Sequence, residues 1–317
     1  MIAFLFPGQG SQVVGMGRAL AERCPEAKAA FEEADAALGF PLTDVMWNGP
    51  EDALKATENA QPALLAHGIA AWRVVSARGL APGFTAGHSL GEYSAHVCAG
   101  SLDFADALRL VRRRGQLMAE AGRVRPGAMA AILGLPGERV ESVCADVRAA
   151  GKGTVVAANF NSPGQVVISG EVDAVEAAMA TLKANGAKKV LRLPVSGAFH
   201  SPLMGPAAEG LVAALAGVTV KDARCPVIAN VDARPVIRAD EIRDRLGRQL
   251  LAAVRWEESM RVLLAAGVTA FVELGSGKVL RGLLRQIAPE AKSANVDDPA
   301  SLDQTLAALP AGSEAGT

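Results

Sequence analysis

The feature that most constrains the fold is a change in the order of predicted elements near the middle of the chain. Residues 125–195 contain two helical patterns and four strand-like apolar runs, in the order β-α-β-β-α-β. The two middle strands are separated only by the sequence NSPG (161–164), which predicts a tight hairpin. This order is typical of a ferredoxin-like unit. We therefore predict a small inserted domain over residues 125–195.

The rest of the chain alternates short apolar runs with longer helical patterns. Helices are predicted between four strands, which are expected at residues 2–6, 83–87, 225–231 and 270–274. Such alternation favours a parallel sheet with helices on both faces. We expect an α/β fold whose large domain is discontinuous and is formed by residues 1–124 and 196–310. The polar tail, residues 311–317, is expected to fray.

Composition excludes several classes of protein. The 317 residues include 32 basic and 33 acidic ones, and a net charge of −1 argues against a globally basic surface for nucleic acid. No apolar stretch reaches the roughly 18 residues of a membrane span, and the first residues lack the basic segment of a signal peptide. The four cysteines form no CxxC pair and no Cys/His cluster, so we expect no metal site. These features predict a cytoplasmic protein that binds neither nucleic acid nor membrane.

The sharpest motif is Gly87-His88-Ser89-Leu90-Gly91, a G-x-S-x-G sequence between a predicted strand and a predicted helix. This is the context of a nucleophile elbow, in which a serine hydroxyl projects from the edge of the sheet. The helix that follows would place its free N–H groups and positive dipole end beside that oxygen. A simpler interpretation is a helix-capping box, because residues 89–92 also fit S-x-x-E. Capping alone does not require glycine on both sides of the serine, so we favour a nucleophile.

A serine nucleophile needs a base, and the chain offers four histidines. His88 adjoins the serine, but consecutive side chains around such a turn diverge. His96 lies two turns along the next helix, and His67 falls within a helical pattern. His200 lies in the connection that returns to the large domain, and loops carry function disproportionately. We therefore prefer His200 as the base, the alternative being an ordinary loop histidine.

Two glycine-rich turns and one arginine run leave more than one interpretation open. The turn FPGQGSQ (6–12) fails the dinucleotide fingerprint because Val13 stands where the third glycine belongs. It is either a tight turn or a loop whose N–H groups face an anion. The segment ELGSGKV (273–279) does not fit the Walker A pattern. The run at residues 112–114 places three arginines about 100° apart on a helix, so at least one could turn inward toward a carboxylate or phosphate.

Taken together, these segments resemble the family of malonyl-CoA:acyl carrier protein transacylases. The resemblance covers residues 3–287 in family order. The shared segments are FPGQGSQ (6–12), QPALLA (61–66), AGHSLGEY (86–93), RRRGQLM (112–118), NFNSPGQVVISG (159–170), VSGAFHSPLM (195–204), VRW (254–256) and ELGSGKVL (273–280). The resemblance implies a hydrolase-like large domain that carries a ferredoxin-like insert.

The resemblance also implies a mechanism. Malonyl would pass from malonyl-CoA to the phosphopantetheine thiol of acyl carrier protein through a malonyl-serine on Ser89, with His200 as base and no acidic third member. The backbone amides of Gln9 and Leu90 would hold the oxyanion, and the backbone carbonyl of Gln249 would orient the histidine. The family implies no bound cofactor, with the CoA thioester as substrate. It also implies a monomer that binds the carrier protein transiently in fatty-acid or polyketide synthesis.

The resemblance also implies which residues select the acyl group and which attract the carrier protein. Arg114 matches the arginine that pairs with the free carboxylate of malonyl. Phe199, beside the histidine, would line the acyl pocket and disfavour methylmalonyl. Carrier proteins of this kind are acidic, so basic residues should steer them, and Lys188 and Lys189 are candidates.

Two other classes of function stay open. A serine thioesterase would share the elbow but release the acyl group to water, with no need for an inward arginine. A nucleotide-binding α/β module is suggested by the glycine turns, although the failed fingerprints argue against it. Assays of free against transferred malonyl, and of stabilisation by NAD or ATP, separate these alternatives.

Overall fold

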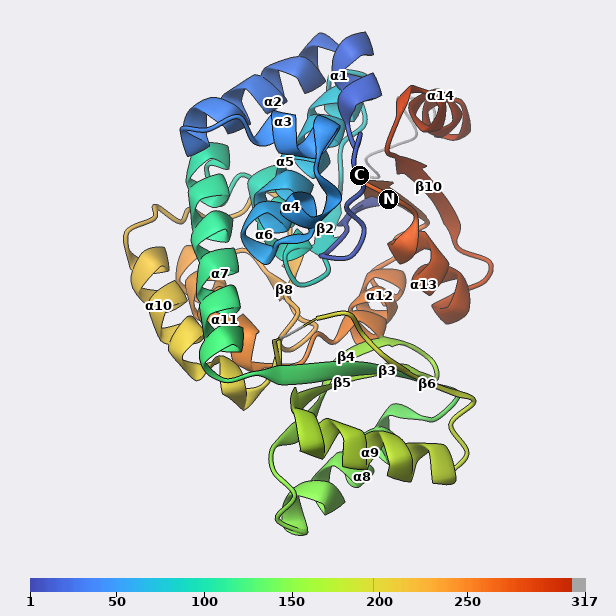
Figure 1. The fold of residues 1–317 in the computed structure, drawn as a ribbon. Coiled ribbons are helices and arrows are strands. Elements are labelled where there is room, and N and C mark those ends of the chain that lie inside the picture. The colour runs from blue at the N-terminus through green and yellow to red at the C-terminus, as the bar shows by residue number, and fades with distance from the viewer. Residues whose placement is uncertain (196, 310–317) are drawn as a thin grey trace.

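A computed structural model describes residues 1–195 and 197–309. In it the chain forms two sheets of different kinds, a six-stranded sheet that is parallel except at one edge and a four-stranded antiparallel sheet (Figure 1). The fold is therefore α/β with a mixed parallel sheet and a separate small antiparallel sheet. Among the described residues, no helix combines the length and apolar character needed to cross a bilayer.

The large sheet has the strand order β10-β9-β1-β2-β7-β8. All neighbours in it are parallel except β7 and β8, which are antiparallel. The strands are β1 (Ile2–Phe6), β2 (Phe84–Gly87), β7 (Val227–Ile228), β8 (Pro235–Val236), β9 (Ala270–Leu274) and β10 (Lys292–Val296). The elements β1 and β2 lie at the centre of the sheet, so the turns that follow them meet at one edge.

Helices cover both faces of this sheet, as the alternation predicted. Because side chains alternate across a strand, Phe4 and Phe6 of β1 pack into one core cluster while Ala3 and Leu5 pack into another. The first cluster is closed by α1 (Arg18–Arg23), α2 (Pro25–Leu38), α3 (Leu42–Asn48), α4 (Glu51–Lys55), α5 (Thr57–Ser76), α6 (Gly91–Cys98), α7 (Phe104–Val124), α10 (Gly205–Ala216) and α11 (Ala239–Arg248). The second is closed by α12 (Trp256–Ala265) and α13 (Val279–Ile287).

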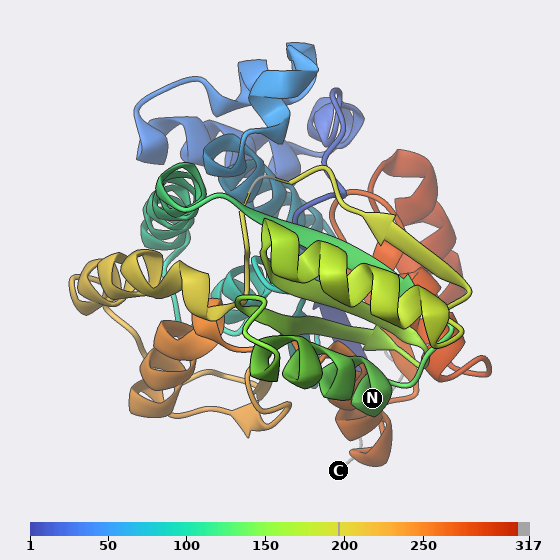
Figure 2. The same ribbon diagram turned by 60° about the horizontal axis from the view of Figure 1, so that its bottom comes forward.

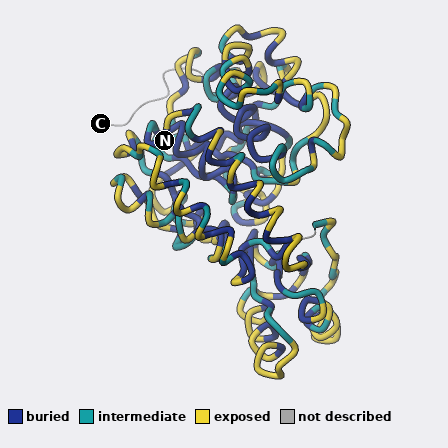
Figure 3. Tube along the Cα trace, turned by 60° about the vertical axis from the view of Figure 1, so that its left-hand side comes forward, coloured by how far each residue is buried: buried dark blue, intermediate teal, exposed yellow. Residues whose placement is uncertain are grey.

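The small sheet is built by the middle of the chain. Its strands are β3 (Gly127–Leu133), β4 (Val155–Ser162), β5 (Gln165–Glu171) and β6 (Lys189–Arg192), in the order β4-β5-β3-β6. The helices α8 (Gly137–Ala149) and α9 (Val172–Ala184) cover one face, and Figure 2 shows them side by side on it. The outer turns of these helices are exposed, whereas buried residues concentrate in the centre of the larger part (Figure 3).

Backbone hydrogen bonds join the small sheet to the loop before α12, and a side-chain hydrogen bond joins it to α13. The Phe160 amide donates to the carbonyl of Val254 at 2.9 Å, and the Val254 amide donates to the carbonyl of Ala158 at 2.8 Å. The Ser162 hydroxyl also donates to Gln286 of α13 at 2.8 Å. The loop before α12 therefore runs as a short parallel neighbour of β4. These bonds fix the antiparallel sheet over the edge of the large one.

The structure corrects the predicted strand at 225–231, adds elements that were not predicted, and does not describe the predicted tail. The strand predicted at 225–231 is only Val227–Ile228, because Asn230 leaves the sheet to hydrogen bond at the elbow. The strand β10 and the helix α14 (Pro299–Ala308) were not predicted, since Lys292–Val296 has no continuous apolar run. The tail, residues 311–317, lies outside the described residues. The predicted domain boundaries fall at the end of α7 and after β6, and the division itself stays a prediction.

Candidate active site

The turn between β2 and α6 has the geometry of a sharp elbow. Ser89 has a φ of 50°, in the left-handed region, which costs a non-glycine residue of order 1–3 kcal/mol. A Cβ on Gly87 would lie 1.9 Å from the backbone of Gly91, and one on Gly91 would lie 2.0 Å from the carbonyl oxygen of Phe6. Both flanking positions therefore require glycine because the strand, the turn and the helix approach so closely.

Asn230 holds this strained turn from the segment that follows β7. Its Oδ1 accepts from the Ser89 amide at 2.7 Å, and its Nδ2 donates to the carbonyl of Gly87 at 2.7 Å. Two such bonds contribute about 1 kcal/mol each, a magnitude that offsets much of the strain. No sequence pattern singles out Asn230, because it acts from a segment about 140 residues away in the chain.

The capping-box interpretation of Ser89 is wrong. The cap position of α6 is Leu90, and no side chain caps this end of the helix. The Glu92 carboxylate, which a capping box would turn back to the serine amide, instead accepts from the Asn230 amide and from the side chain of Gln249. The serine hydroxyl is therefore left free of any helix-capping duty.

Ser89 and His200 meet, although 111 positions separate them in the chain. The Ser89 Oγ lies 2.8 Å from Nε2 of His200. The other ring nitrogen, Nδ1, lies 3.0 Å from the carbonyl oxygen of Gln249 and 3.1 Å from that of Ala252. Carbonyl oxygens only accept, so Nδ1 carries the hydrogen and Nε2 presents a lone pair to the serine hydroxyl. This is the tautomer that a general base requires.

Electrostatics keep this histidine neutral. Burial lowers the pKa of His200 to about 3, and the positive charge of Arg114 acts in the same direction. His200 itself has a φ of 55°, so the loop holds it in a conformation that non-glycine residues seldom adopt. The base is therefore in its unprotonated form at neutral pH.

Arg114 is the member of the arginine run that turns inward. Its side chain is 1% exposed, whereas Arg113 is exposed and Arg112 is half-buried. The guanidinium donates from Nη1 to Gln61 at 2.8 Å, and from Nη2 to Ser89 Oγ at 3.1 Å and Gln249 Oε1 at 2.9 Å. All three acceptors are uncharged, and Nε has no hydrogen-bond partner among the described residues. A buried cation held only by neutral groups retains the capacity to pair with an incoming anion.

Gln249 does more than the sequence predicted. The resemblance implied a role for its backbone carbonyl alone. Its side-chain Nε2 also donates to the carbonyl of Ser89 at 3.0 Å and to Glu92 at 2.6 Å, while its Oε1 accepts from Arg114. Through its side chain and its backbone carbonyl, this one buried residue therefore connects the elbow, the arginine and the histidine.

A cavity of about 570 Å³ opens in front of these groups, between the two sheets. The large sheet contributes the turn after β1 and the elbow, and the small sheet contributes the face of β3 and β5 that its helices leave uncovered. Gln9, Leu90 and Phe199 all line it, as do Ser89, Arg114 and His200. The backbone amides of Gln9 and Leu90 donate to no protein acceptor in residues 1–195 and 197–309. They are thus available to a ligand in the cavity.

The remaining sequence candidates do not contact the serine hydroxyl, although His88 also lines the cavity. His88 faces the small sheet, with Nε2 2.9 Å from Oδ1 of Asn161, and does not contact the serine hydroxyl. His67 is buried 3.0 Å from the carbonyl of Asp297. Lys188 and Lys189 are exposed at the start of β6 and do not line the cavity, whose basic lining residues are Lys55 and Arg114.

The comparisons with known proteins decide the family. The model of the acyl transferase domain matches residues 3–298. The chain belongs to the malonyl-CoA–acyl carrier protein transacylases. It is 48% identical over 308 residues to the transacylase of this name from Bacillus subtilis, and 47% identical over 306 residues to that from Escherichia coli K12. These alignments cover 97% and 96% of this chain, and 97% and 98% of the relatives.

Solved structures agree with the family assignment. The acyl-carrier-protein-S-malonyltransferase from Bartonella henselae superimposes with a TM-score of 0.93 at 43% identity, covering 97% of this chain and 98% of that one. A malonyl transacylase solved in complex with a type II polyketide synthase acyl carrier protein superimposes with a TM-score of 0.93 at 45% identity. That alignment covers 97% of this chain and 99% of the other. As a member of this transacylase family, the protein is an acyltransferase.

Proposed function

We propose that the protein transfers malonyl from malonyl-CoA to the phosphopantetheine thiol of an acyl carrier protein, in two steps through a malonyl ester of Ser89. The observation that carries the proposal is the surroundings of the Ser89 hydroxyl. It lies 2.8 Å from the unprotonated nitrogen of His200 and 3.1 Å from the guanidinium of Arg114. A base and an anion-binding group therefore meet at one nucleophile.

In the first step, His200 Nε2 takes the proton of Ser89 as its oxygen attacks the thioester carbonyl carbon of malonyl-CoA. The tetrahedral oxyanion accepts hydrogen bonds from the amides of Gln9 and Leu90, and such donors contribute about 2.7–4 kcal/mol each in other acyl-transfer enzymes. The carbon–sulfur bond then breaks, and the CoA sulfur leaves with the proton that His200 returns. The product of this half-reaction is malonyl-Ser89.

In the second step, the carrier's phosphopantetheine thiol takes the place of CoA. His200 accepts the thiol proton, the sulfur attacks the ester carbonyl, and the same two amides stabilise the oxyanion. Collapse breaks the bond to Ser89 Oγ, which recovers its proton from His200. This sequence is ping-pong covalent catalysis. No acidic residue is needed, because two backbone carbonyls already hold the Nδ1 hydrogen.

Arg114 gives the site its preference for a dicarboxylic acyl group. In malonyl-Ser89 the free carboxylate is three bonds from Oγ, within reach of a guanidinium that already contacts that oxygen. The carboxylate also neutralises the charge that helps to lower the pKa of His200. Substrate binding therefore makes the histidine a stronger base in the complex than in the free enzyme.

The small antiparallel sheet forms the other wall of the acyl site. We propose that it is a ferredoxin-like insert, because the elements β3-α8-β4-β5-α9-β6 follow the β-α-β-β-α-β order with the strand order β4-β5-β3-β6. The exposed lysines at the start of β6, Lys188 and Lys189, would steer an acidic carrier protein toward the cavity.

The test uses malonyl-CoA labelled in the malonyl group. Brief incubation without carrier, followed by peptide mapping, should place the label on Ser89, and addition of carrier protein should move it to the carrier. The Ser89→Ala protein should bind malonyl-CoA without becoming labelled. Label on a cysteine, or release of free malonate in place of transfer, would replace this proposal with a different nucleophile or with a thioesterase.

A further inference from the structure

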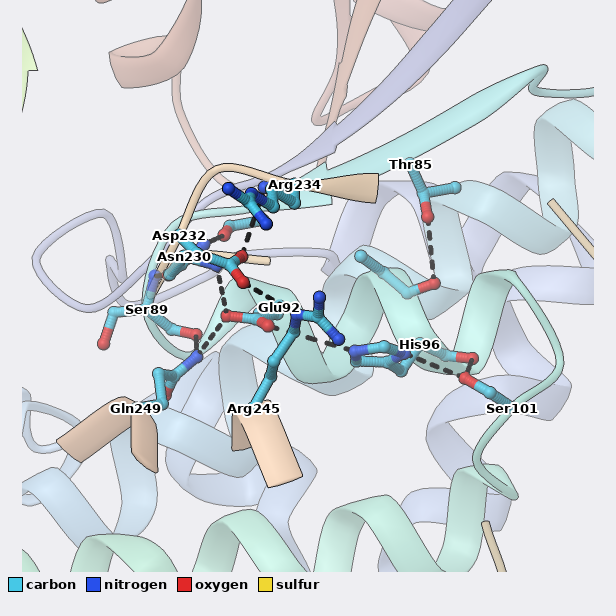
Figure 4. Close-up of polar contacts among 12 residues, drawn as sticks. Thr85, Ser89, Glu92, His96, Ser101, Asn230, Asp232, Arg234, Arg245 and Gln249 are labelled. Atoms are coloured by element: carbon cyan, nitrogen blue, oxygen red, sulfur yellow. Dashed lines mark hydrogen bonds and ion pairs between the residues drawn. The ribbon is translucent and has the colours of Figure 1, made fainter. Parts of the chain in front are cut away.

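A cluster of buried polar side chains that do not line the cavity lies next to the elbow and consists of Glu92, His96, Asn230 and Gln249 (Figure 4). At its centre is Glu92, which is fully buried on the first turn of α6. Its Oε2 accepts from the backbone N–H of Asn230 at 3.1 Å and from Nε2 of Gln249 at 2.6 Å. Burying a carboxyl group costs free energy unless the group is hydrogen bonded. Packing alone therefore does not explain why a glutamate occupies position 92.

The other oxygen of this carboxyl faces a histidine. Glu92 Oε1 lies 4.0 Å from Nε2 of His96, and neither atom has a hydrogen-bond partner among the described residues. The Ser101 hydroxyl donates to the His96 carbonyl and so accepts from Nδ1 of the ring, which leaves a lone pair on Nε2. A proton on Oε1 turns two facing lone pairs into a donor and an acceptor. Burial, which raises the pKa of Glu92 to about 7, is consistent with that proton.

We propose that Glu92 is a positioning residue of the acyl-transfer site, whose carboxyl aligns Asn230 and Gln249 and through them the elbow and Arg114. The assignment rests on the proposed function, because it explains how that site is held. Glu92 binds the backbone N–H of Asn230 and the side-chain amide of Gln249. The same two residues contact the backbone of Ser89.

Two routes lead from this carboxyl to the reacting atoms. Through Asn230, it fixes the residue whose Oδ1 and Nδ2 hold the Ser89 amide and the Gly87 carbonyl. Through Gln249, it sets which end of the amide faces Arg114. With Nε2 turned to Glu92, Oε1 must face the guanidinium, as observed. A reversed amide would present N–H groups to the cation and push it away from Ser89.

Two substitutions separate hydrogen bonding from charge and size. Glu92→Gln keeps an acceptor oxygen at the Oε2 position and turns amide N–H groups, in place of an oxygen lone pair, toward His96. Glu92→Met has a similar length but no acceptor, so it leaves the Asn230 amide and Gln249 Nε2 unpaired. The control is Leu20→Ala, a core truncation in α1 that destabilises the fold without touching the site.

The experiment measures kcat and KM for malonyl and acetyl transfer to the carrier, together with urea unfolding of each protein. At matched fractions of folded protein, Glu92→Met should lower the malonyl-to-acetyl ratio of kcat/KM at least fivefold and should reduce kcat for malonyl. Glu92→Gln should keep both within about twofold of the parent, and Leu20→Ala should keep the ratio while losing stability.

A purely structural role predicts a different pattern. If folded Glu92→Met kept the parent ratio, as Leu20→Ala should, the positioning role would be overturned. Loss of the ratio in Glu92→Gln to the same extent as in Glu92→Met would also overturn it, because charge and not hydrogen-bond alignment would then be responsible. In either case malonyl labelling of Ser89 in the parent protein would leave the proposed function standing.

Discussion

Replacing Arg114 with alanine tests how the acyl group is selected. The guanidinium is buried, contacts Ser89 Oγ at 3.1 Å and has only neutral acceptors, so a malonyl carboxylate would be its one anionic partner in the cavity. A charge-assisted hydrogen bond contributes about 1.5–3 kcal/mol, or roughly ten- to a hundredfold in rate. Acetyl has no carboxylate and cannot gain this energy. Arg114→Ala should therefore lose malonyl transfer by that factor relative to acetyl transfer.

The assay is transfer of labelled malonyl and acetyl from their CoA thioesters to carrier protein, compared as kcat/KM. Arg114→Lys should recover only part of the preference, because a single ammonium cannot grip both carboxylate oxygens as the guanidinium fork does. The matched control is Arg113→Ala, which removes an exposed arginine from the adjacent position of the same helix. If Arg114→Ala lowered malonyl and acetyl transfer by the same factor, the carboxylate-anchoring role would have to be abandoned.

Three further predictions concern pH, the carrier and the acyl pocket. The pKa of His200 is about 3 in the native protein and 6.5 in the unfolded chain. Below pH 6.5 the unfolded chain therefore binds a proton that the native protein does not bind. The contribution of His200 to the unfolding free energy is thus present above pH 6.5 and is lost as the pH falls toward 3. Between pH 7 and pH 5, the parent should lose about 2 kcal/mol more unfolding free energy than His200→Gln, measured with urea, and equal losses would contradict the buried neutral state. The rate with carrier as the varied substrate should fall steeply with salt, and less steeply in a Lys188→Glu, Lys189→Glu double variant; a salt-independent rate would exclude electrostatic steering. Phe199→Ala should raise methylmalonyl transfer relative to malonyl by no more than about a hundredfold, because one methyl group is worth about 1–3 kcal/mol, and an unchanged ratio would show that Phe199 does not crowd the substrate.

Several elements were predictable because their signals are local. The apolar run Ile2–Phe6 is a buried strand, and Asp103 caps α7 by accepting from the amides of Ala105 and Asp106, as its position before the helical pattern predicted. The hairpin between β4 and β5 turns at Pro163-Gly164, within the predicted NSPG segment. The strand β10 was missed because it lies at a sheet edge and its first two residues, Lys292 and Ser293, are polar.

Within the site, a local sequence motif was enough to predict the nucleophile. Gly87 and Gly91 mark the elbow because no larger residue fits that turn, and this marked Ser89 as the candidate nucleophile. The same segment also fitted a helix cap, and only the course of the Glu92 side chain decided between the two. His200 was preferred from its place in a connection, without any pattern that aimed it at the serine.

By itself, the sequence determined the α/β class, the glycine-bounded serine and the presence of a separate β-α-β-β-α-β segment, since each depends on neighbours within a few turns of chain. The tertiary structure decided which histidine meets Ser89, which of three arginines is buried, and that Asn230, Glu92 and Gln249 support them. These contacts join residues 25 to 160 positions apart. Hydrogen bonds across such separations follow from how strands and helices pack, and no periodicity or local motif encodes them.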